Sequence, residues 1–129
     1  MTVALALPAE PVWVNGEDVR LQQVLVNLFT NAGYSMRGRP ERTLHIGLTV
    51  EAERATLTVR DTGRGIAPDD LARLFVPFFT TKEAGEGLGL GLSISHGIVR
   101  DFGGTIAATN HPEGGACFTL RLKRTEAPA

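Results

Sequence analysis

A run of alternating glycines is the first stretch of this sequence whose residue types could do chemistry. It reads Gly85-Glu86-Gly87-Leu88-Gly89-Leu90-Gly91-Leu92. An apolar residue then recurs every four positions, at Leu90, Ile94, Ile98 and Phe102, which predicts a helix with these residues on one face. A helix start offers unpaired backbone N–H groups, and glycines let a phosphate come close to them. A linker before a buried helix would give the same pattern, because glycine-rich loops are weakly specific.

A second feature is a row of amide side chains. Gln23, Asn27 and Asn31 are spaced four residues apart beside the apolar stripe of a helix predicted from about Val19 to Met36. Asparagine is a mediocre helix former, so its repetition at this spacing needs a reason. Amide oxygens aimed into a pocket could ligate a hard cation such as magnesium. An exposed polar row is the alternative interpretation.

A third feature is the carboxylate of Asp61. It follows a predicted strand and continues the parity of Leu57 and Val59, so it should point to the core face of the sheet. A carboxylate in that position is costly unless it has a partner. The turn that follows reads Asp61-Thr62-Gly63-Arg64-Gly65-Ile66. We interpret Asp61 as an acceptor for a ligand N–H group in preference to a simple turn cap.

A phenylalanine-rich run leads into the glycines. It reads Phe75-Val76-Pro77-Phe78-Phe79-Thr80-Thr81-Lys82 and follows a short helix predicted from Asp70 to Leu74. The run is either a hydrophobic plug that anchors a long loop or part of a lid. In a lid, the side chains of Thr80, Thr81 and Lys82 could reach phosphates.

The elements that must position these residues alternate between strands and helices. The predicted strands are Val3 to Leu7 at an edge, Val12 to Val14, Leu44 to Val50, Ala55 to Asp61, and a hairpin of Thr105 to Asn110 with Ala116 to Lys123. A chain of 129 residues is long enough for one domain with a real core.

Composition excludes several classes of function. The net charge of -1 gives no indication of a nucleic-acid or basic membrane surface, and a single cysteine rules out an internal disulfide. No apolar run approaches the ~18–20 residues of a membrane span. The glycine run is not directly preceded by a predicted strand and has no acidic residue about 20 positions later, as a dinucleotide site would require. The sequence also has no G-x-x-x-x-G-K-[ST] phosphate-binding loop and no G-x-S-x-G nucleophile motif. The three histidines show no metal-ligand spacing.

Taken together, these motifs resemble the histidine-kinase catalytic domain. The amide row resembles its N box, Asp61-x-Gly63-x-Gly65 its G1 box and Phe75-x-x-Phe78-Phe79 its F box. Gly87-x-Gly89-x-Gly91 resembles its G2 box, and Gly103-Gly104-Thr105 its closing glycine motif. The order and spacing of these motifs agree with that family over roughly residues 12 to 123. The residues within the motifs are most similar to those of nitrogen-regulation and C4-dicarboxylate-transport sensor kinases.

The resemblance implies an α+β fold, a two-layer α/β sandwich of the Bergerat (GHKL) type. Its sheet would be mixed and mostly antiparallel, with helices on one face. A single ATP-binding catalytic domain would span residues 1–129, with an ATP lid over residues 76–92.

The resemblance also implies the cofactors ATP and Mg²⁺. Asp61 would accept from the adenine amino group, Asn31 would ligate Mg²⁺, and Asn27 would support the phosphates or the metal's waters. Lys82 and the N–H groups of Gly89 to Leu92 would hold the phosphate chain, so that Asn27, Asn31 and Lys82 form the catalytic set. Further nucleotide contacts are expected from Tyr34, Gly63, Gly65, Ile66, Phe79, Thr80, Thr81, Gly87, Leu88, Gly89, Leu90, Gly91 and Leu92.

The same family suggests which reaction follows. Hydrolytic relatives in the superfamily carry a glutamate where this chain has Asn27, and an amide cannot act as a general base. Hydrolysis should therefore be slow. ATP would instead be presented to a histidine on a separate dimerisation domain, and the phosphoryl group would pass from there to a response regulator receiver domain. A serine protein kinase of the anti-sigma type and a non-catalytic nucleotide-binding module are the alternatives. We expect a cytoplasmic, monomeric domain that contacts neither nucleic acid nor membrane.

Two positions depart from the family pattern. Tyr34 stands where lysine or aspartate is frequent, which puts a phosphate contact there in question and suggests stacking or hydrogen bonding instead. Ala116 stands where a threonine often begins the last strand, and its parity places it on the face of Phe118 and Leu120.

Overall fold

Five strands form one mixed sheet in the order β1-β2-β3-β5-β4 in this computed structural model, which describes residues 1–77 and 91–126. β1 runs parallel to β2, and the other neighbouring pairs are antiparallel. The elements are β1 (Thr2–Ala6), α1 (Asp18–Ser35), β2 (Thr43–Val50), β3 (Arg54–Arg60), α2 (Pro68–Leu71), α3 (Gly91–Asp101), β4 (Thr105–Asn110) and β5 (Ala116–Lys123).

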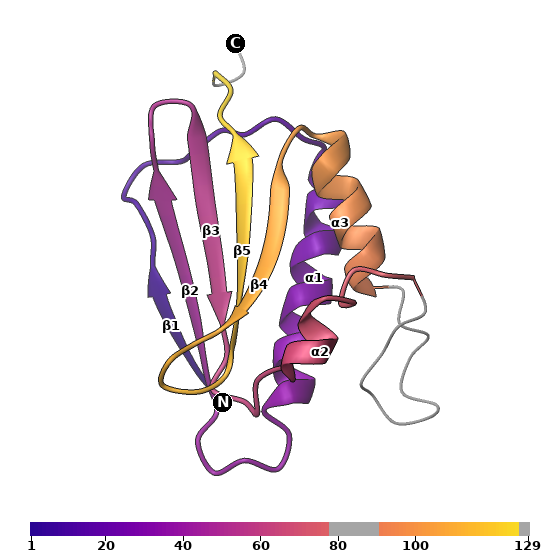
Figure 1. The fold of residues 1–129 in the computed structure, drawn as a ribbon. Coiled ribbons are helices and arrows are strands. Elements are labelled where there is room, and N and C mark those ends of the chain that lie inside the picture. Colours follow the sequence, from indigo (N-terminus) through magenta and orange to yellow (C-terminus); the bar gives the residue numbers. More distant parts are fainter. Residues whose placement is uncertain (78–90, 127–129) are drawn as a thin grey trace.

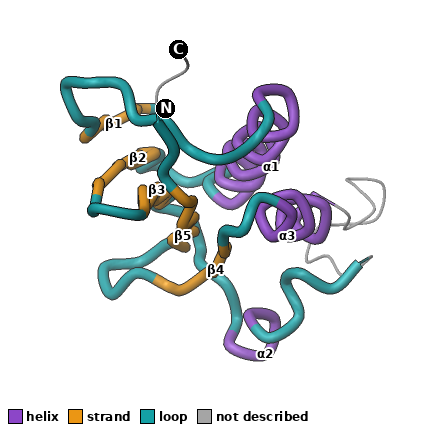
Figure 2. Tube along the Cα trace, turned by 90° about the horizontal axis from the view of Figure 1, so that it is seen from above, coloured by secondary structure: helices purple, strands orange, loops and turns teal. Residues whose placement is uncertain are grey.

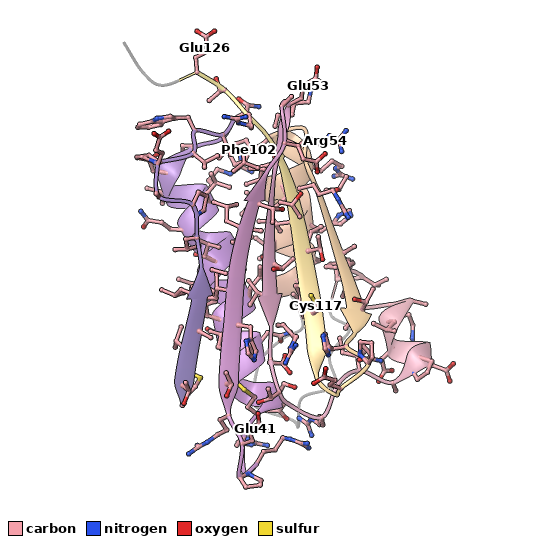
Figure 3. The ribbon with its side chains drawn as sticks, turned by 90° about the vertical axis from the view of Figure 1, so that its left-hand side faces the viewer. Glu41, Glu53, Arg54, Phe102, Cys117 and Glu126 are labelled. Carbon is pink, nitrogen blue, oxygen red and sulfur yellow. The ribbon has the colours of Figure 1, made fainter. Side chains whose placement is uncertain are left out.

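The long helices α1 and α3 lie side by side on one face of the sheet, and the short α2 lies near its β4 end (Figures 1 and 2). This arrangement confirms the α+β sandwich with helices on one face. α1 runs from the end of the sheet that carries the β2–β3 turn to the opposite end. Figure 3 marks these two ends by Glu53 and Glu41. The turn that follows β3 lies at the Glu41 end, beside the last turn of α1 (Figure 1).

The core lies between the sheet and the two helices. In β5 the residues of one parity are buried and the others are more open, as expected for a sheet covered on one side. Ala116 faces the core with Phe118 and Leu120, as its parity predicts. On the helix side, Val24 and Leu28 are at most 1% exposed. Burying each such side chain contributes about 1.5–3 kcal/mol, which fixes α1 on the sheet.

Two predicted elements differ from the structure. Val12 to Val14 does not form a strand, because only Val14 pairs, in an isolated bridge with Arg124. The short helix begins at Pro68 and ends at Leu71 instead of spanning 70–74. Pro68 has the fixed backbone angle that suits a first helical position, and the preceding residue is extended. The predicted edge position of the first strand is confirmed.

The buried face of α3 also differs from the prediction. Ile94 is 47% exposed, whereas Ser95, Ile98 and Val99 are buried. α3 contacts α1 as well as the sheet, so its buried stripe is turned toward α1. A polar residue, Ser95, therefore takes a place in the core.

Candidate functional site

Asp61 lies at the end of β3 on the core side, as its strand parity predicts, and it is only 2% exposed. Its Oδ1 accepts hydrogen bonds from the backbone N–H of Gly63 at 2.8 Å and of Ala116 at 3.2 Å. The hydroxyl of Ser35 lies 3.4 Å from the same oxygen. Among the described residues, no group donates to Oδ2. One carboxylate oxygen is thus held by the protein, and the other remains available to a ligand.

We call residues 61–66, which follow β3, the acidic turn. A Cβ atom at Gly63 would overlap the hydroxyl and carbonyl oxygens of Ser35, so only glycine lets this turn touch the last turn of α1. Gly65 has a φ of 76°, a conformation that favours glycine. The Thr62 hydroxyl accepts from the Thr43 N–H at 2.9 Å and so ties the turn to the start of β2.

Asn110 holds the far end of the acidic turn. Its Oδ1 accepts from the N–H of Ile66 at 2.8 Å, and its Nδ2 donates to the Ile66 carbonyl at 2.6 Å. A Cβ atom at Gly115 would overlap the carbonyl oxygen of Asp61, so the β4–β5 loop also packs closely on the turn. The predicted contact residues Gly63, Gly65 and Ile66 are therefore placed by side chains and backbone from three other parts of the chain.

The amide of Asn27 joins α1 to the start of α3. Its Nδ2 donates to the Gly91 carbonyl and to the Ser95 hydroxyl, each at 3.0 Å, while its Oδ1 accepts from Gln23 Nε2 at 2.9 Å. A carbonyl can only accept, so Gly91 fixes which end of the amide faces α3. Both N–H groups of Asn27 are thus used within the protein. We call this network of Gln23, Asn27, Gly91 and Ser95 the amide clasp.

Asn31 is one helical turn further along α1 and is half-buried. Among the described residues, its amide has no hydrogen-bond partner, which distinguishes it from Asn27. A half-buried amide oxygen with no partner suits a hard cation, so Asn31 fits the expected magnesium ligand. Within residues 1–77 and 91–126, no group of three His, Cys, Asp or Glu side chains could hold a metal. Water molecules and the phosphates of a nucleotide would supply the other ligands.

Several predicted site residues lie outside the described part of the chain. They are Phe78, Phe79, Thr80, Thr81, Lys82, Gly87, Leu88, Gly89 and Leu90. The expected lid over residues 76–92 is therefore described only at its two ends. At the later end, the side chain of Leu92 packs against the core, which leaves its backbone for any ligand contact.

A separate hollow of about 200 Å³ lies between α1, the sheet and the segment before α1. All the residues that line it are apolar, among them Val12, Leu25 and Leu57. Without a polar side chain in its lining, this hollow is poorly suited to orient a charged ligand, so the polar residues around Asp61 form the candidate site. None of the helices in the described residues is long and apolar enough to cross a membrane.

Sequence reasoning did not identify three residues that build the site: Ser35 as a partner of Asp61, Ser95 and Asn110. Ser95 carried no distinct signal, because Ser93 and His96 make neighbouring positions of α3 polar as well. Asn110 directly precedes the predicted β4–β5 loop, but nothing in its neighbourhood indicates a contact with a turn 44 residues earlier.

Comparisons with known proteins agree with this architecture. The family model for histidine kinase-, DNA gyrase B- and HSP90-like ATPases matches residues 16–126. The chain is 43% identical over 117 residues to the C4-dicarboxylate transport sensor protein DctB of Pseudomonas aeruginosa, covering 90% of this chain and 19% of that protein. It is 42% identical over 110 residues to the sensor protein FixL of Bradyrhizobium diazoefficiens, covering 84% of this chain and 21% of that protein. The chain therefore spans about a fifth of the length of these curated relatives.

Solved structures give the same result. The catalytic domain of the histidine kinase ThkA superposes with a TM-score of 0.84 at 30% identity, over 96% of this chain and 79% of that one. Full-length ShkA, solved in complex with AMPPNP, superposes with a TM-score of 0.79 at 28% identity, over 99% of this chain and 26% of that one.

Proposed function

Because the chain belongs to the family of histidine kinase-, DNA gyrase B- and HSP90-like ATPases, as its motifs predict, we propose that it binds Mg-ATP beside the acidic turn and presents the γ-phosphate to a histidine. The chain is a catalytic domain of the sensor histidine kinase type. The acceptor histidine would lie on a dimerisation domain of the same protein, and the phosphoryl group would pass on to a response regulator receiver domain.

The geometry of Asp61 is the observation that carries this proposal. A carboxylate that is 2% exposed keeps one oxygen on two backbone N–H groups and offers the other to a ligand. The amino group of adenine is a suitable donor for that oxygen. Guanine presents a carbonyl oxygen at the same position, so it would place two acceptors against each other. Losing the hydrogen bond costs about 1–3 kcal/mol, or roughly 5- to 150-fold in affinity.

Asn31 would hold the magnesium ion, whose charge neutralises the phosphate oxygens. The nucleotide would then run from Asp61, at the last turn of α1, toward the start of α3. The roles that we assign to Phe79, Thr80, Thr81, Lys82 and the glycines from Gly87 onward rest on the resemblance.

Asn27 bears on the choice between hydrolysis and transfer. Its amide cannot accept a proton from water, and the amide clasp already uses both of its N–H groups. We therefore assign Asn27 the role of holding the start of α3, with its Oδ1 facing Gln23. Phosphoryl transfer would then depend on positioning and charge neutralisation, with the acid–base group supplied by the partner domain.

A titration with Mg-ATP tests the binding step. Wild type should bind, Asp61→Asn should bind much more weakly, and Asn31→Ala should lose the magnesium dependence. Glu53→Gln is a matched control, because it removes an exposed charge at the opposite end of the sheet (Figure 3). Absence of binding by wild type would refute the proposal. Retained magnesium dependence in Asn31→Ala would refute the metal assignment only.

Transfer is tested by adding a histidine-bearing helical domain from a sensor kinase of the DctB type. Acid-labile phosphate on that domain is the expected product. Acid-stable phosphoserine on a partner protein would instead favour the serine-kinase alternative. Binding without any transfer would favour the non-catalytic module.

A further inference from the structure

Two arginines lie on the ring of Tyr34, a residue that departs from the family pattern. The guanidinium carbon of Arg37 is 4.5 Å from the ring centroid, and that of Arg64 is 5.1 Å from it. Both distances are within the range of a cation–π interaction. Tyr34 lies in the last turn of α1 and Arg37 lies just after the helix, whereas Arg64 belongs to the acidic turn. The ring therefore holds a side chain of the acidic turn against the helix.

The position of Arg64 relates it directly to the candidate site. It follows Gly63, whose N–H donates to Asp61, and its own N–H lies 3.4 Å from the Ser35 carbonyl. Ser35 in turn places its hydroxyl beside Asp61. Arg64 thus shares its backbone anchoring with the carboxylate that we assign to the adenine amino group.

The charge of Arg64 is not neutralised within the described part of the chain. Its side chain is exposed and makes no ion pair with any described residue. Asp61 is nearby but buried, with Oδ1 facing backbone N–H groups. A guanidinium held over a ring keeps its planar fork of N–H donors for a phosphate or carboxylate.

The helix gives a scale for the distance along the nucleotide. With a rise of about 1.5 Å per residue, Asn31 lies about 6 Å and Asn27 about 12 Å from the level of Ser35. Arg64 is anchored at the Ser35 level, where the base would lie. The phosphate nearest to that level is the one attached to the ribose. The β- and γ-phosphates would lie closer to Asn31 and the start of α3.

We propose that Arg64, held in place by the ring of Tyr34, binds the α-phosphate of the nucleotide. This inference rests on the proposed function and adds a residue that determines affinity for nucleotides over nucleosides. Arg37 on the same ring adds positive charge at this end of the site. Tyr34 acts as a positioning residue, because it contacts the guanidinium group and need not contact the nucleotide.

The test compares adenosine, AMP, ADP and ATP as competitors of a fluorescent ATP analogue. Arg64→Gln should weaken the binding of AMP, ADP and ATP by a similar factor, about threefold to tenfold, and leave the affinity for adenosine within about twofold of wild type. Raising the salt concentration should reduce the difference between wild type and variant. Arg54→Gln, at the far end of the sheet (Figure 3), should leave all four ligands unchanged.

Two substitutions of the ring separate positioning from contact. Tyr34→Phe keeps the ring and should bind AMP as wild type does. Tyr34→Leu removes the ring and should approach the affinity of Arg64→Gln, with adenosine again unchanged. Melting temperatures within a few degrees of wild type would show that each variant is folded.

The outcomes distinguish this proposal from the function on which it rests. Equal losses for adenosine and AMP in Arg64→Gln would show that Arg64 shapes the base pocket, and would overturn the proposal. A loss that appears only with ADP or ATP would place the contact further along the phosphate chain and would also overturn it. If wild type bound none of the four ligands, the proposed function itself would fail.

Discussion

Replacing Asp61 by asparagine should change which base the site prefers, and the structure fixes the direction of that change. Oδ1 of Asp61 accepts from the N–H groups of Gly63 and Ala116, at 2.8 and 3.2 Å. An asparagine at this position has one oxygen and one NH₂ group. The two backbone donors require the oxygen on their side, because the opposite orientation would bring an NH₂ group against two N–H groups. The NH₂ group must therefore take the place of Oδ2, which faces the ligand.

The magnitude follows from this orientation. With ATP, the adenine amino group would meet an N–H donor and lose its acceptor, which costs about 1–3 kcal/mol, or roughly 5- to 150-fold. With inosine triphosphate, the base presents a carbonyl oxygen that the new NH₂ group can reach. In Asp61→Asn, ATP affinity should fall while ITP affinity rises. The ratio of ATP affinity to ITP affinity should therefore fall by a larger factor than ATP affinity alone.

The assay is a competition titration with ATP and ITP on both proteins, with Glu53→Gln as the charge control. ITP is preferable to GTP because it carries the carbonyl oxygen without the additional amino group of guanine. Thermal unfolding should show that Asp61→Asn remains folded, since the two backbone hydrogen bonds survive. An unchanged ratio of ATP to ITP affinity would refute the assignment of Asp61 to the adenine amino group.

Three further substitutions test how the site is held. Ser95→Ala should lower the free energy of unfolding by about 1 kcal/mol, a few degrees in melting temperature, because Asn27 loses an acceptor. The stability losses of Asn27→Ala and Ser95→Ala should be non-additive because both belong to the amide clasp, and additive losses would argue against this coupling. The exposed Thr30→Ala is its control and should change the melting temperature little. Gly63→Ala should lower the free energy of unfolding by about 1–3 kcal/mol and weaken ATP binding, because a Cβ atom would overlap the end of α1. A variant with the stability and ATP affinity of wild type would contradict this packing. Asn110→Ala should loosen the acidic turn and show faster amide hydrogen exchange there, and unchanged exchange would show that its two hydrogen bonds are dispensable.

Local patterns in the sequence determined much of this protein. Period-two alternation located β2 and β3, and the turn residues between Asn110 and Ala116 located the hairpin of β4 and β5. The helical period of α1 located its apolar stripe, in which Val24 and Leu28 are buried. The parity of β3 placed Asp61 on the core side, where the structure finds it 2% exposed. The order of five short motifs indicated the family. Each of these inferences depends on neighbours within a few residues, because backbone geometry fixes which side chains share a face.

The tertiary structure decided what depends on contacts between distant segments. It buried Ser95 and exposed Ile94, because α3 packs against α1 as well as against the sheet. It also showed that Asn27 uses its N–H groups on α3, while Asn31 one turn later keeps its amide available. By spacing alone these two residues are equivalent, since both belong to the same row on the same helix. Only the position of a helix that begins 64 residues later distinguishes them, and no local pattern carries that information.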